Sequence, residues 1–382
     1  MTSGAAGGSG PAGGSTVGAR GGLPERRGLR VASMVVLLTV ALAGSGRAAA
    51  ASATVNGGSA DGPAASEDAG AREIALFRDA ALFFAPDSVA QFGHPGYGAL
   101  DNGRVAVARV DVPPSGARDR IEARIAFRPV PKDERSVHDR WDRAGNLRLT
   151  VPGHPDLEVA RFMTAYGGRT DWRFDVSHLA PLLRGECEFK LFVDTWVHPA
   201  WRADVSLRVY ADSTYDAPTW AMPIFYAEDF SVEKNAAGSE VDVMVPPGLA
   251  RVAMSYLSTG HCTDGRDEDE FVSKANVIWV DGVSVERFHP WRDDCHQYRA
   301  INPYCSRWTD GSWSSDYRRS GWCPGKEVVP TEIDLSDHLI AGPHRLRFVI
   351  ENMRPKLEDH YGYWRVSACL VGWETPPLLW RN

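Results

Sequence analysis

Hydrophobic and polar side chains alternate along much of this chain, and this period of two restricts its fold more than any other feature. Every second residue is apolar in stretches such as 205–209, 241–245 and 346–350. Turn-forming residues separate these stretches, as in the Pro-Pro-Ser-Gly of 113–116, and few segments have the pattern of a long helix. The pattern therefore predicts an all-β protein made of antiparallel sandwiches.

The length of the chain predicts more than one domain. A chain of 382 residues with 43% hydrophobic residues can bury a sizeable core, and its folded part is longer than one average domain. The segment 213–218 is short and polar, ends in proline, and divides the folded region into similar halves. We therefore expect one sandwich domain at 72–214 and a second at 215–375.

The N-terminal part has the features of an export signal. Residues 1–30 are largely Gly-rich and low in complexity, and 54–71 are mostly small residues, so we expect both to be disordered. Between them, 31–53 holds an apolar run and then small residues, which predicts a signal sequence with its cleavage region. The run is too short to span a bilayer comfortably, and the preceding pair Arg26 and Arg27 would also suit twin-arginine export. We expect a secreted or periplasmic protein with no membrane span in the mature chain.

Export permits disulfides, so the six cysteines can form up to three bridges. Cys305 and Cys323 enclose a loop of aromatic and small polar residues that packing alone would not stabilise, and we predict a bridge between them. A second predicted bridge joins Cys262 to Cys295, which flank an irregular acidic stretch. Two further cysteines lie in strand-like surroundings and are either a long-range pair or buried thiols, namely Cys187 and Cys369.

Charge and histidine content narrow the possible partners. The net charge of -7 argues against nucleic acid, whose phosphates require clustered Lys and Arg. The eleven histidines are scattered, and neither a CxxC pair nor an HExxH motif occurs, so we expect no metal and no other cofactor. We also expect a monomer. Thirteen Trp and eleven Tyr exceed the usual need of a core, and although most should be core residues, their flat faces suit sugar rings.

Charged side chains lie beside tryptophans at the ends of predicted strands. Trp141-Asp142-Arg143 precedes the alternating stretch 146–151, and Asp194-Thr195-Trp196 follows the strand 189–193. Loops at such positions often carry function, but each motif alone also fits a surface carboxylate beside a core tryptophan. The acidic cluster 264–270 could equally be a solvated loop or a calcium site.

The order of these motifs along the chain resembles that of the peptide-N-glycosidase F family, over roughly residues 120–371. The resemblance is carried by the following elements in sequence: Trp141-Asp142-Arg143-Ala144-Gly145-Asn146, the run 160–166, Asp194-Thr195-Trp196, Gly260-His261, Glu268 with Phe271, and Arg319-Ser320-Gly321-Trp322-Cys323-Pro324-Gly325. It implies two jelly-roll domains side by side with an active site in the cleft between them. It also implies an amidase that cuts the bond between asparagine and the first N-acetylglucosamine of an N-linked glycan.

The resemblance further implies roles for individual residues. Asp142 would activate the attacking water, and Glu268 would be a second essential carboxylate. Asp194 stands where the family has a glutamate, which shortens the reach of that carboxylate. The substrate would be contacted by a set of neighbouring cationic and aromatic residues: Trp141, Arg143, Trp196, His261, Arg319 and Trp322.

Departures from the family pattern leave alternatives open. The loop between His261 and Glu268 is shorter than in the family and Asp269 replaces a tryptophan, so Glu270 is an alternative to Glu268. Thr259 replaces another tryptophan, and 131–138 replaces an expected cysteine pair. The chain could therefore be a non-catalytic glycan-binding or cell-surface module, or an amidase on a different glycoconjugate. A metal-dependent oxygenase is a more distant alternative, because it would need histidine pairs.

Overall fold

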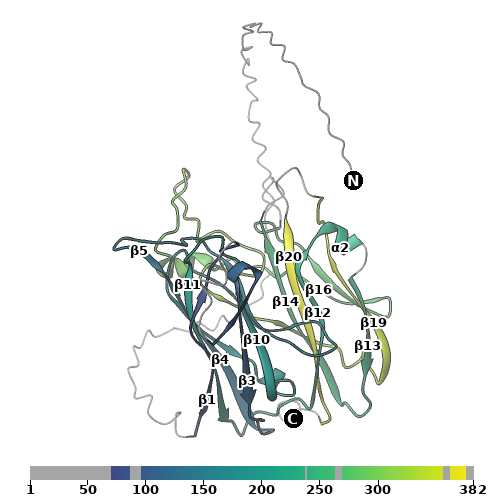
Figure 1. The fold of residues 1–382 in the computed structure, drawn as a ribbon. Coiled ribbons are helices and arrows are strands. Elements are labelled where there is room, and N and C mark those ends of the chain that lie inside the picture. The colour runs from purple at the N-terminus through teal and green to yellow at the C-terminus, as the bar shows by residue number, and fades with distance from the viewer. Residues whose placement is uncertain (1–69, 87–95, 237–238, 263–268, 356–361, 376–382) are drawn as a thin grey trace, which may run out of the picture. The chain divides into compact units, whose positions relative to one another are not determined.

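The structure, a computed structural model, describes residues 70–86, 96–236, 239–262, 269–355 and 362–375 (Figure 1). Every described residue lies in one compact unit, which spans 63–382. The predicted signal sequence and its flanking segments, up to residue 69, lie outside the described residues. Every strand pair is antiparallel, and the fold is all-β with two domains, as the alternating sequence predicts.

The strands of the first half form two sheets. The four-stranded sheet has the order β1 (Arg72–Leu82), β11 (Trp201–Ala211), β4 (Asp119–Pro129) and β9 (Thr170–Asp175). The six-stranded sheet has the order β17 (Glu327–Val328), β8 (Leu157–Met163), β7 (Ala144–Leu149), β10 (Gly185–Val193), β3 (Val105–Val112) and β2 (Gly98–Leu100). The short strand β17 comes from the second half, so the two halves share a sheet.

The strands of the second half form two four-stranded sheets. One has the order β12 (Trp220–Phe230), β20 (Tyr363–Trp373), β14 (Arg251–His261) and β18 (Thr331–Asp334). The other has the order β13 (Ser239–Val245), β19 (Gly342–Ile350), β15 (Asn276–Val280) and β16 (Val283–Phe288). The boundary predicted between 214 and 215 falls in the connection from β11 to β12 and stays a prediction.

Helical and short elements complete the described chain. These are η1 (Asp101–Gly103), η2 (Ser177–Leu179), η3 (Cys295–Ile301), α2 (Val232–Ala236) and the two-stranded ribbon of β5 (Pro131–Asp133) with β6 (Ser136–Val137). Among the described residues, no helix has the length and apolar character needed to cross a membrane.

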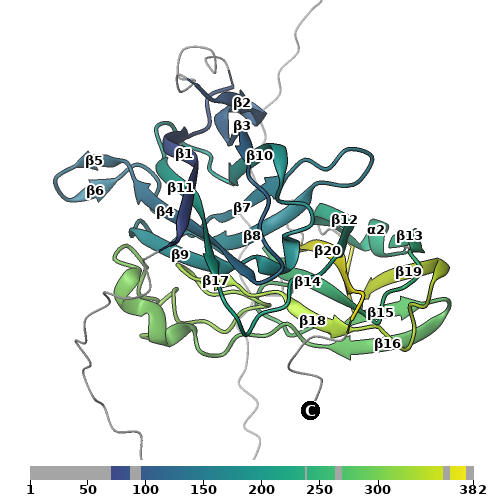
Figure 2. The ribbon, with the colours of Figure 1, turned by 90° about the horizontal axis from the view of Figure 1, so that it is seen from below.

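Burial along the strands shows where the two halves meet. In β11, buried and partly exposed residues alternate, as expected when one face covers a core and the other meets water. In β7 and β8, every residue is buried, so both faces are covered. The core cluster around these strands continues into Cys369 and Val371 of β20, which belongs to the second half (Figure 2). The six-stranded sheet therefore packs against the β12–β20 sheet.

Candidate active site

An aspartate from the first half and an arginine from the second meet in the structure. Asp142 lies between β6 and β7, and Arg319 lies in the long connection from β16 to β17. The Arg319 Nη2 is 3.4 Å from the Asp142 Oδ2, and their side chains are only 2% and 12% exposed. These two residues are far apart in sequence, so the fold has brought them together.

The guanidinium of Arg319 is held on several sides. Its Nη2 donates to the Ser314 carbonyl at 2.8 Å and to the Tyr166 hydroxyl at 3.3 Å. The ring of Trp322 lies 4.3 Å from the guanidinium carbon and that of Phe271 lies 5.0 Å from it. Stacking and hydrogen bonding together fix the direction of the cation, as is common for arginines that bind carboxylates.

Glu270 is the glutamate that joins this group among the described residues. Its carboxylate forms an ion pair with the Arg319 Nη1, and its Oε2 accepts a hydrogen bond from the Cys262 backbone N–H at 3.0 Å. Glu268, the residue that the resemblance favours, lies outside the described residues. Glu270 is therefore a described partner of Arg319, and the choice between Glu268 and Glu270 as the second carboxylate stays a prediction.

The surroundings of Asp142 change its acidity. Burial raises the pKa of the Asp142 carboxyl, and this effect outweighs the nearby Arg319 cation and a hydrogen bond from Tyr166, which both lower it. Burial and the Asp142 charge in turn raise the pKa of Tyr166, so this phenol stays protonated at neutral pH. A carboxylate with a raised pKa is a stronger base than an ordinary one, which suits the activation of water.

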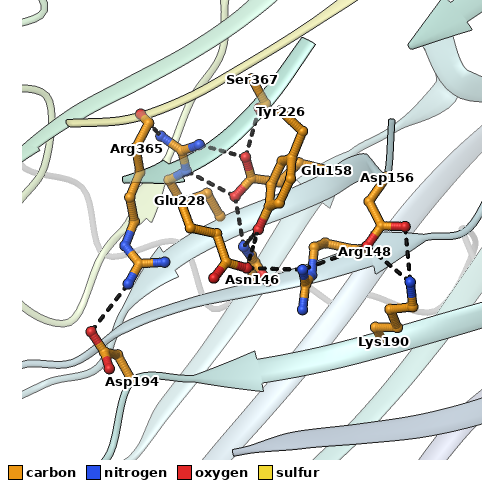
Figure 3. A network of polar contacts seen from close by, with 11 residues as sticks. Asn146, Arg148, Asp156, Glu158, Lys190, Asp194, Tyr226, Glu228, Arg365 and Ser367 are labelled. Carbon is orange, nitrogen blue, oxygen red and sulfur yellow. Dashed lines mark hydrogen bonds and ion pairs between the residues drawn. The ribbon is translucent and has the colours of Figure 1, made fainter. Parts of the chain in front are cut away.

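Asp194, the third carboxylate predicted to be catalytic, lies between two arginines at the end of β10. Its Oδ1 is 3.2 Å from the Arg104 Nη1. Its Oδ2 is 3.1 Å from the Arg365 Nη2, and Figure 3 shows this second contact. Arg104 also lies 4.5 Å from the centre of the Trp196 ring. Trp196 and Trp141 are 57% and 52% exposed, so both rings are available to a ligand.

Three other predicted contact residues are already engaged within the protein. Arg143 pairs at 2.9 Å with Asp139, which is fully buried, so its cation supports the loop around Asp142. Trp322 is 3% exposed and donates from its indole N–H to the Gly260 carbonyl at 2.8 Å. Its buried ring stacks on the Arg319 guanidinium, and its predicted contact with substrate stays a prediction.

His261 is also buried, and its predicted contact with substrate stays a prediction. Its ring stacks between Trp322 and Tyr363, with centroid distances of 5.6 and 5.5 Å. The Nε2 is 2.8 Å from the Thr259 hydroxyl. Burial lowers the pKa of His261 well below its ordinary value, with further lowering by nearby arginines, so the imidazole is neutral.

The disulfide that borders the site differs from both predicted bridges. Cys295 is joined to Cys323, 28 residues later, and both are fully buried. Cys305 and Cys262 are free thiols, as are the two strand cysteines Cys187 and Cys369. The predicted pairs were wrong because they were chosen from neighbouring loops, whereas the turn of η3 brings Cys295 beneath the Trp322 segment.

A buried polar network joins the two halves next to Asp194. Arg161 of β8 forms an ion pair with Glu158 and donates at 2.7 Å to the Arg365 carbonyl and at 3.1 Å to the Thr259 hydroxyl. Glu158 also accepts a hydrogen bond from Ser367 at 2.6 Å (Figure 3). The network therefore fixes β14 and β20, which carry His261 and Arg365, against the first sandwich.

The network continues toward solvent. Asn146 donates to the Tyr226 hydroxyl at 3.1 Å, and Arg148 donates to Glu228 at 2.9 Å (Figure 3). Each pair again links a strand of the first half to β12. These contacts fix the position of the β12–β20 sheet relative to the six-stranded sheet.

Sequence reasoning missed Tyr166, Asp139 and Arg365. Tyr166 ends the run 160–166 that carried part of the resemblance, so its position was available as a signal. Arg365 lies within a strand pattern, and its inward direction could not be read from alternation, because β20 is buried along almost its whole length. Among the described residues, one group has the spacing of metal ligands, Asp294 with Cys295 and Cys323, but its two sulfurs form the disulfide.

Comparison with known families covers both halves of the chain. Residues 150–209 match the family described as Peptide-N-glycosidase F, N terminal, and residues 228–371 match that described as Peptide-N-glycosidase F, C terminal. Together the two matches cover more than half of the sequence and follow the family order. The chain belongs to the peptide-N-glycosidase F family.

One curated relative and two solved structures illustrate the similarity of this chain to other peptide-N-glycosidase F proteins in sequence and fold. The peptide-N(4)-(N-acetyl-beta-D-glucosaminyl)asparagine amidase F of Elizabethkingia miricola is 24% identical over 233 residues, which are 53% of this chain and 60% of that protein. The structure of PNGF-II is 24% identical with a TM-score of 0.72 over 81% of this chain and 66% of that one. PNGase F of Flavobacterium meningosepticum, described as a glycosylasparaginase, is 15% identical with a TM-score of 0.61, covering 80% and 97%.

These peptide-N-glycosidase F comparisons have definite limits. The chain spans 60% of the length of the curated relative that it matches. The two structural likenesses are under 25% identical and show the fold alone. Arg319 and Glu270 lie within the C-terminal family match, whereas Asp142 precedes the N-terminal one.

Proposed function

We propose that this protein is an amidase that hydrolyses the bond between asparagine and the first N-acetylglucosamine of an N-linked glycan. The reaction would convert asparagine to aspartate and release the glycan as a glycosylamine, which loses ammonia in water. The observation that carries the proposal is the meeting of Asp142, from the first half, and Arg319, from the family-matched part of the second half, 3.4 Å apart.

The chemistry follows from the surroundings of the two residues. Amide hydrolysis needs a base for water, a donor for the developing oxyanion and a proton for the leaving nitrogen. Asp142 supplies the base, because its raised pKa increases its proton affinity while Arg319 keeps its carboxylate oriented. After it has taken the proton from water, the same carboxyl can pass it to the departing nitrogen.

The remaining groups suit recognition of a sugar next to a peptide. Arg319 places a cation beside the reacting carboxylate, and Glu270 balances that charge on the opposite nitrogen. The exposed rings of Trp141 and Trp196 offer flat apolar faces, and Asp194 can accept hydrogen bonds from hydroxyl groups. Export through the N-terminal signal, a monomeric state and the two domain boundaries are part of the same proposal.

Glycan release tests this proposal. A denatured N-glycoprotein is incubated with the wild-type protein or with Asp142→Asn, and the free glycan is quantified by chromatography. We expect release by the wild type and a loss of kcat by roughly a hundredfold or more in the variant, since a positioned base contributes about that much. Asp171→Asn, which changes an exposed carboxylate on the first sandwich, is the matched control and should keep full activity.

A glycan-binding module without activity is the second candidate. The observation that favours it is the engagement of Asp194 by two arginines, which leaves this shortened carboxylate less free than a glutamate would be. Glycan binding by the wild type without any release would support this candidate and contradict the amidase. Release from glycosylasparagines but not from glycoproteins would indicate an amidase on a smaller conjugate.

A further inference from the structure

The exposed tryptophans of the described chain lie around one region. Three tryptophans are more than half exposed, namely Trp141, Trp196 and Trp308, at 52%, 57% and 55%. Trp141 is next to Asp142, and Trp196 closely follows Asp194. Trp308 has no role in the proposed function, and no motif of the sequence pointed to it.

Trp308 stands on a turn that holds its shape through backbone hydrogen bonds. The Trp308 N–H donates to the Ser312 carbonyl at 2.8 Å, and the Gly311 N–H donates to the Trp308 carbonyl at 3.0 Å. Asp310 caps the same turn by accepting from the Ser312 N–H at 2.9 Å. We call residues 306–314 the Trp308 turn. Its bonding means that the exposed indole is presented in a fixed place.

Aromatic contacts connect the Trp308 turn to the candidate active site. The Trp308 ring meets Tyr317 edge-on at 6.1 Å, and Tyr317 meets Phe271 at 5.9 Å. Phe271 lies 5.0 Å from the Arg319 guanidinium carbon. Ser314, whose N–H closes the turn by donating to the Ser306 carbonyl at 2.9 Å, accepts at its own carbonyl from Arg319 at 2.8 Å. The turn and the Arg319 cation are therefore joined by two independent sets of contacts.

The exposure of Trp308 is unfavourable unless something covers it. A large aromatic ring left in water forgoes the stabilisation that its burial would give. Core positions for tryptophan exist in this protein, as Trp201 and Trp364 show at 1% and 0% exposure. A ligand that covers the indole on this structured turn would therefore gain the free energy of burying its face.

We propose that the Trp308 turn is an outer saccharide-binding subsite, which holds a pyranose ring several units beyond the asparagine-linked N-acetylglucosamine. The identity of this ligand rests on the proposed function. The chemistry favours a sugar over an apolar peptide side chain, because the 55% exposed indole stands on a turn that also carries polar side chains. Arg307, Asp310 and Ser312 belong to the same turn and carry groups that can bond to hydroxyls. A pyranose has a matching apolar face and polar rim.

Calorimetry with free sugars tests the subsite without any bond cleavage. The ligands are a released oligomannose N-glycan and the core disaccharide N,N′-diacetylchitobiose, and the proteins are the wild type, Trp308→Ala and Trp308→Phe. We expect the wild type to bind the larger glycan more tightly. Trp308→Ala should raise the Kd for that glycan by about tenfold, as loss of one aromatic contact would, and leave the disaccharide unchanged. Trp308→Phe should recover most of the affinity, and Ile340→Ala, an exposed apolar residue elsewhere, should change neither Kd.

Several results would overturn the subsite. Equal weakening of both sugars, no weakening of either, or a wild type that does not bind the larger glycan more tightly would each do so. If Trp308→Ala instead raised KM only for glycopeptides with longer peptides, the turn would hold polypeptide and the proposal would be wrong. Because binding needs no hydrolysis, a wild type that binds the glycan but releases none would contradict the amidase alone.

Discussion

Asp142 is buried beside the Arg319 guanidinium, and this one pair sets the chemistry that the candidate site can perform. Burial raises the pKa of the carboxyl, whereas the cation opposes that change. The ionised form is the base, so activity should fall as pH decreases through the raised pKa. The acid limb of the pH profile should therefore lie above the range of an ordinary aspartate.

Replacing Arg319 with methionine should move the acid limb of the pH profile to still higher pH. Loss of the cation removes an effect that lowers the pKa of Asp142, so the pKa rises again and the acid limb of kcat/KM shifts to higher pH. We also expect kcat/KM at neutral pH to fall by roughly a hundredfold, because an oriented charge is lost. Measurement of kcat/KM across pH checks both effects. A limb that stays in place or moves to lower pH would show that Asp142 is not the titrating base.

The two candidate glutamates can be separated by substitution. Glu270 pairs with Arg319 and accepts from the Cys262 backbone N–H, so Glu270→Gln should lower kcat by roughly tenfold or more. Glu268→Gln should cost less, because the geometry assigns the partner of Arg319 to Glu270. Steady-state kinetics of the two variants, with circular dichroism to confirm folding, provides the test. A larger loss in Glu268→Gln would restore the assignment that sequence resemblance favours.

At the scale of elements, the network of β7, β8, β12 and β20 holds the two halves of the site together. Burial would raise the pKa of Glu158, but Arg161, Ser367 and Asn146 together leave it lowered, so the carboxyl is ionised in the fold. The guanidinium of Arg161 reaches β14 and β20 through Thr259 and the Arg365 carbonyl. A single side chain thus spans the junction of the two sheets.

Breaking this pair should destabilise the protein strongly. Arg161→Met leaves the buried Glu158 charge without its partner, which typically costs about 3–5 kcal/mol. Adding Glu158→Leu removes that charge and should recover part of the loss. Unfolding in urea gives the free energy of each variant. If the double variant were less stable than Arg161→Met alone, isolation of the Glu158 charge would not explain the cost.

The Cys295–Cys323 bridge should be detectable directly. Peptide mapping without reduction should yield one cross-linked peptide with these two cysteines, and iodoacetamide should label Cys305 and Cys262. A bridge across 28 residues typically contributes roughly 3 kcal/mol, so replacement of both cysteines by alanine should lower stability by about that amount. A cross-linked peptide with Cys305 and Cys323 would contradict the structure.

The sequence predicted the positions of strands better than it predicted which sheets pack against them. Apolar alternation at 205–209, 241–245 and 346–350 falls in β11, β13 and β19, since each of these strands covers a core with one face. Strands β7 and β8 are buried on both faces, and no local pattern shows which partner covers the second face. Contacts with that partner decide the inward direction of Arg161 and Arg365.

The candidate site could be predicted only in part for the same reason. Asp142 and Arg319 were chosen through motif order, and the structure brings them together. The same motif order gave an exposed role to Trp322, but its burial depends on how the connection from β16 to β17 folds back. The choice between Glu268 and Glu270 depended on the shape of a shortened loop, which spacing alone does not fix.

At the scale of the whole molecule, the catalytic proposal depends on both domains. Asp142 comes from the segment before β7, whereas Arg319 and Glu270 come from the second half. The buried network beside Asp194 fixes the register between the halves, and therefore the distance between the carboxylate and its cation. The central claim is that this junction activates water to hydrolyse an asparagine-linked glycan.

Mass spectrometry in water enriched with the heavy oxygen isotope tests this claim most directly. A defined N-glycopeptide is incubated with the wild type or with Asp142→Asn, and the product peptide is sequenced by fragmentation. We predict that the wild type converts the glycosylated asparagine to aspartate carrying one heavy oxygen, and that Asp142→Asn produces almost none. An intact glycopeptide with the folded wild type, or equal heavy-oxygen incorporation by Asp142→Asn, would contradict it.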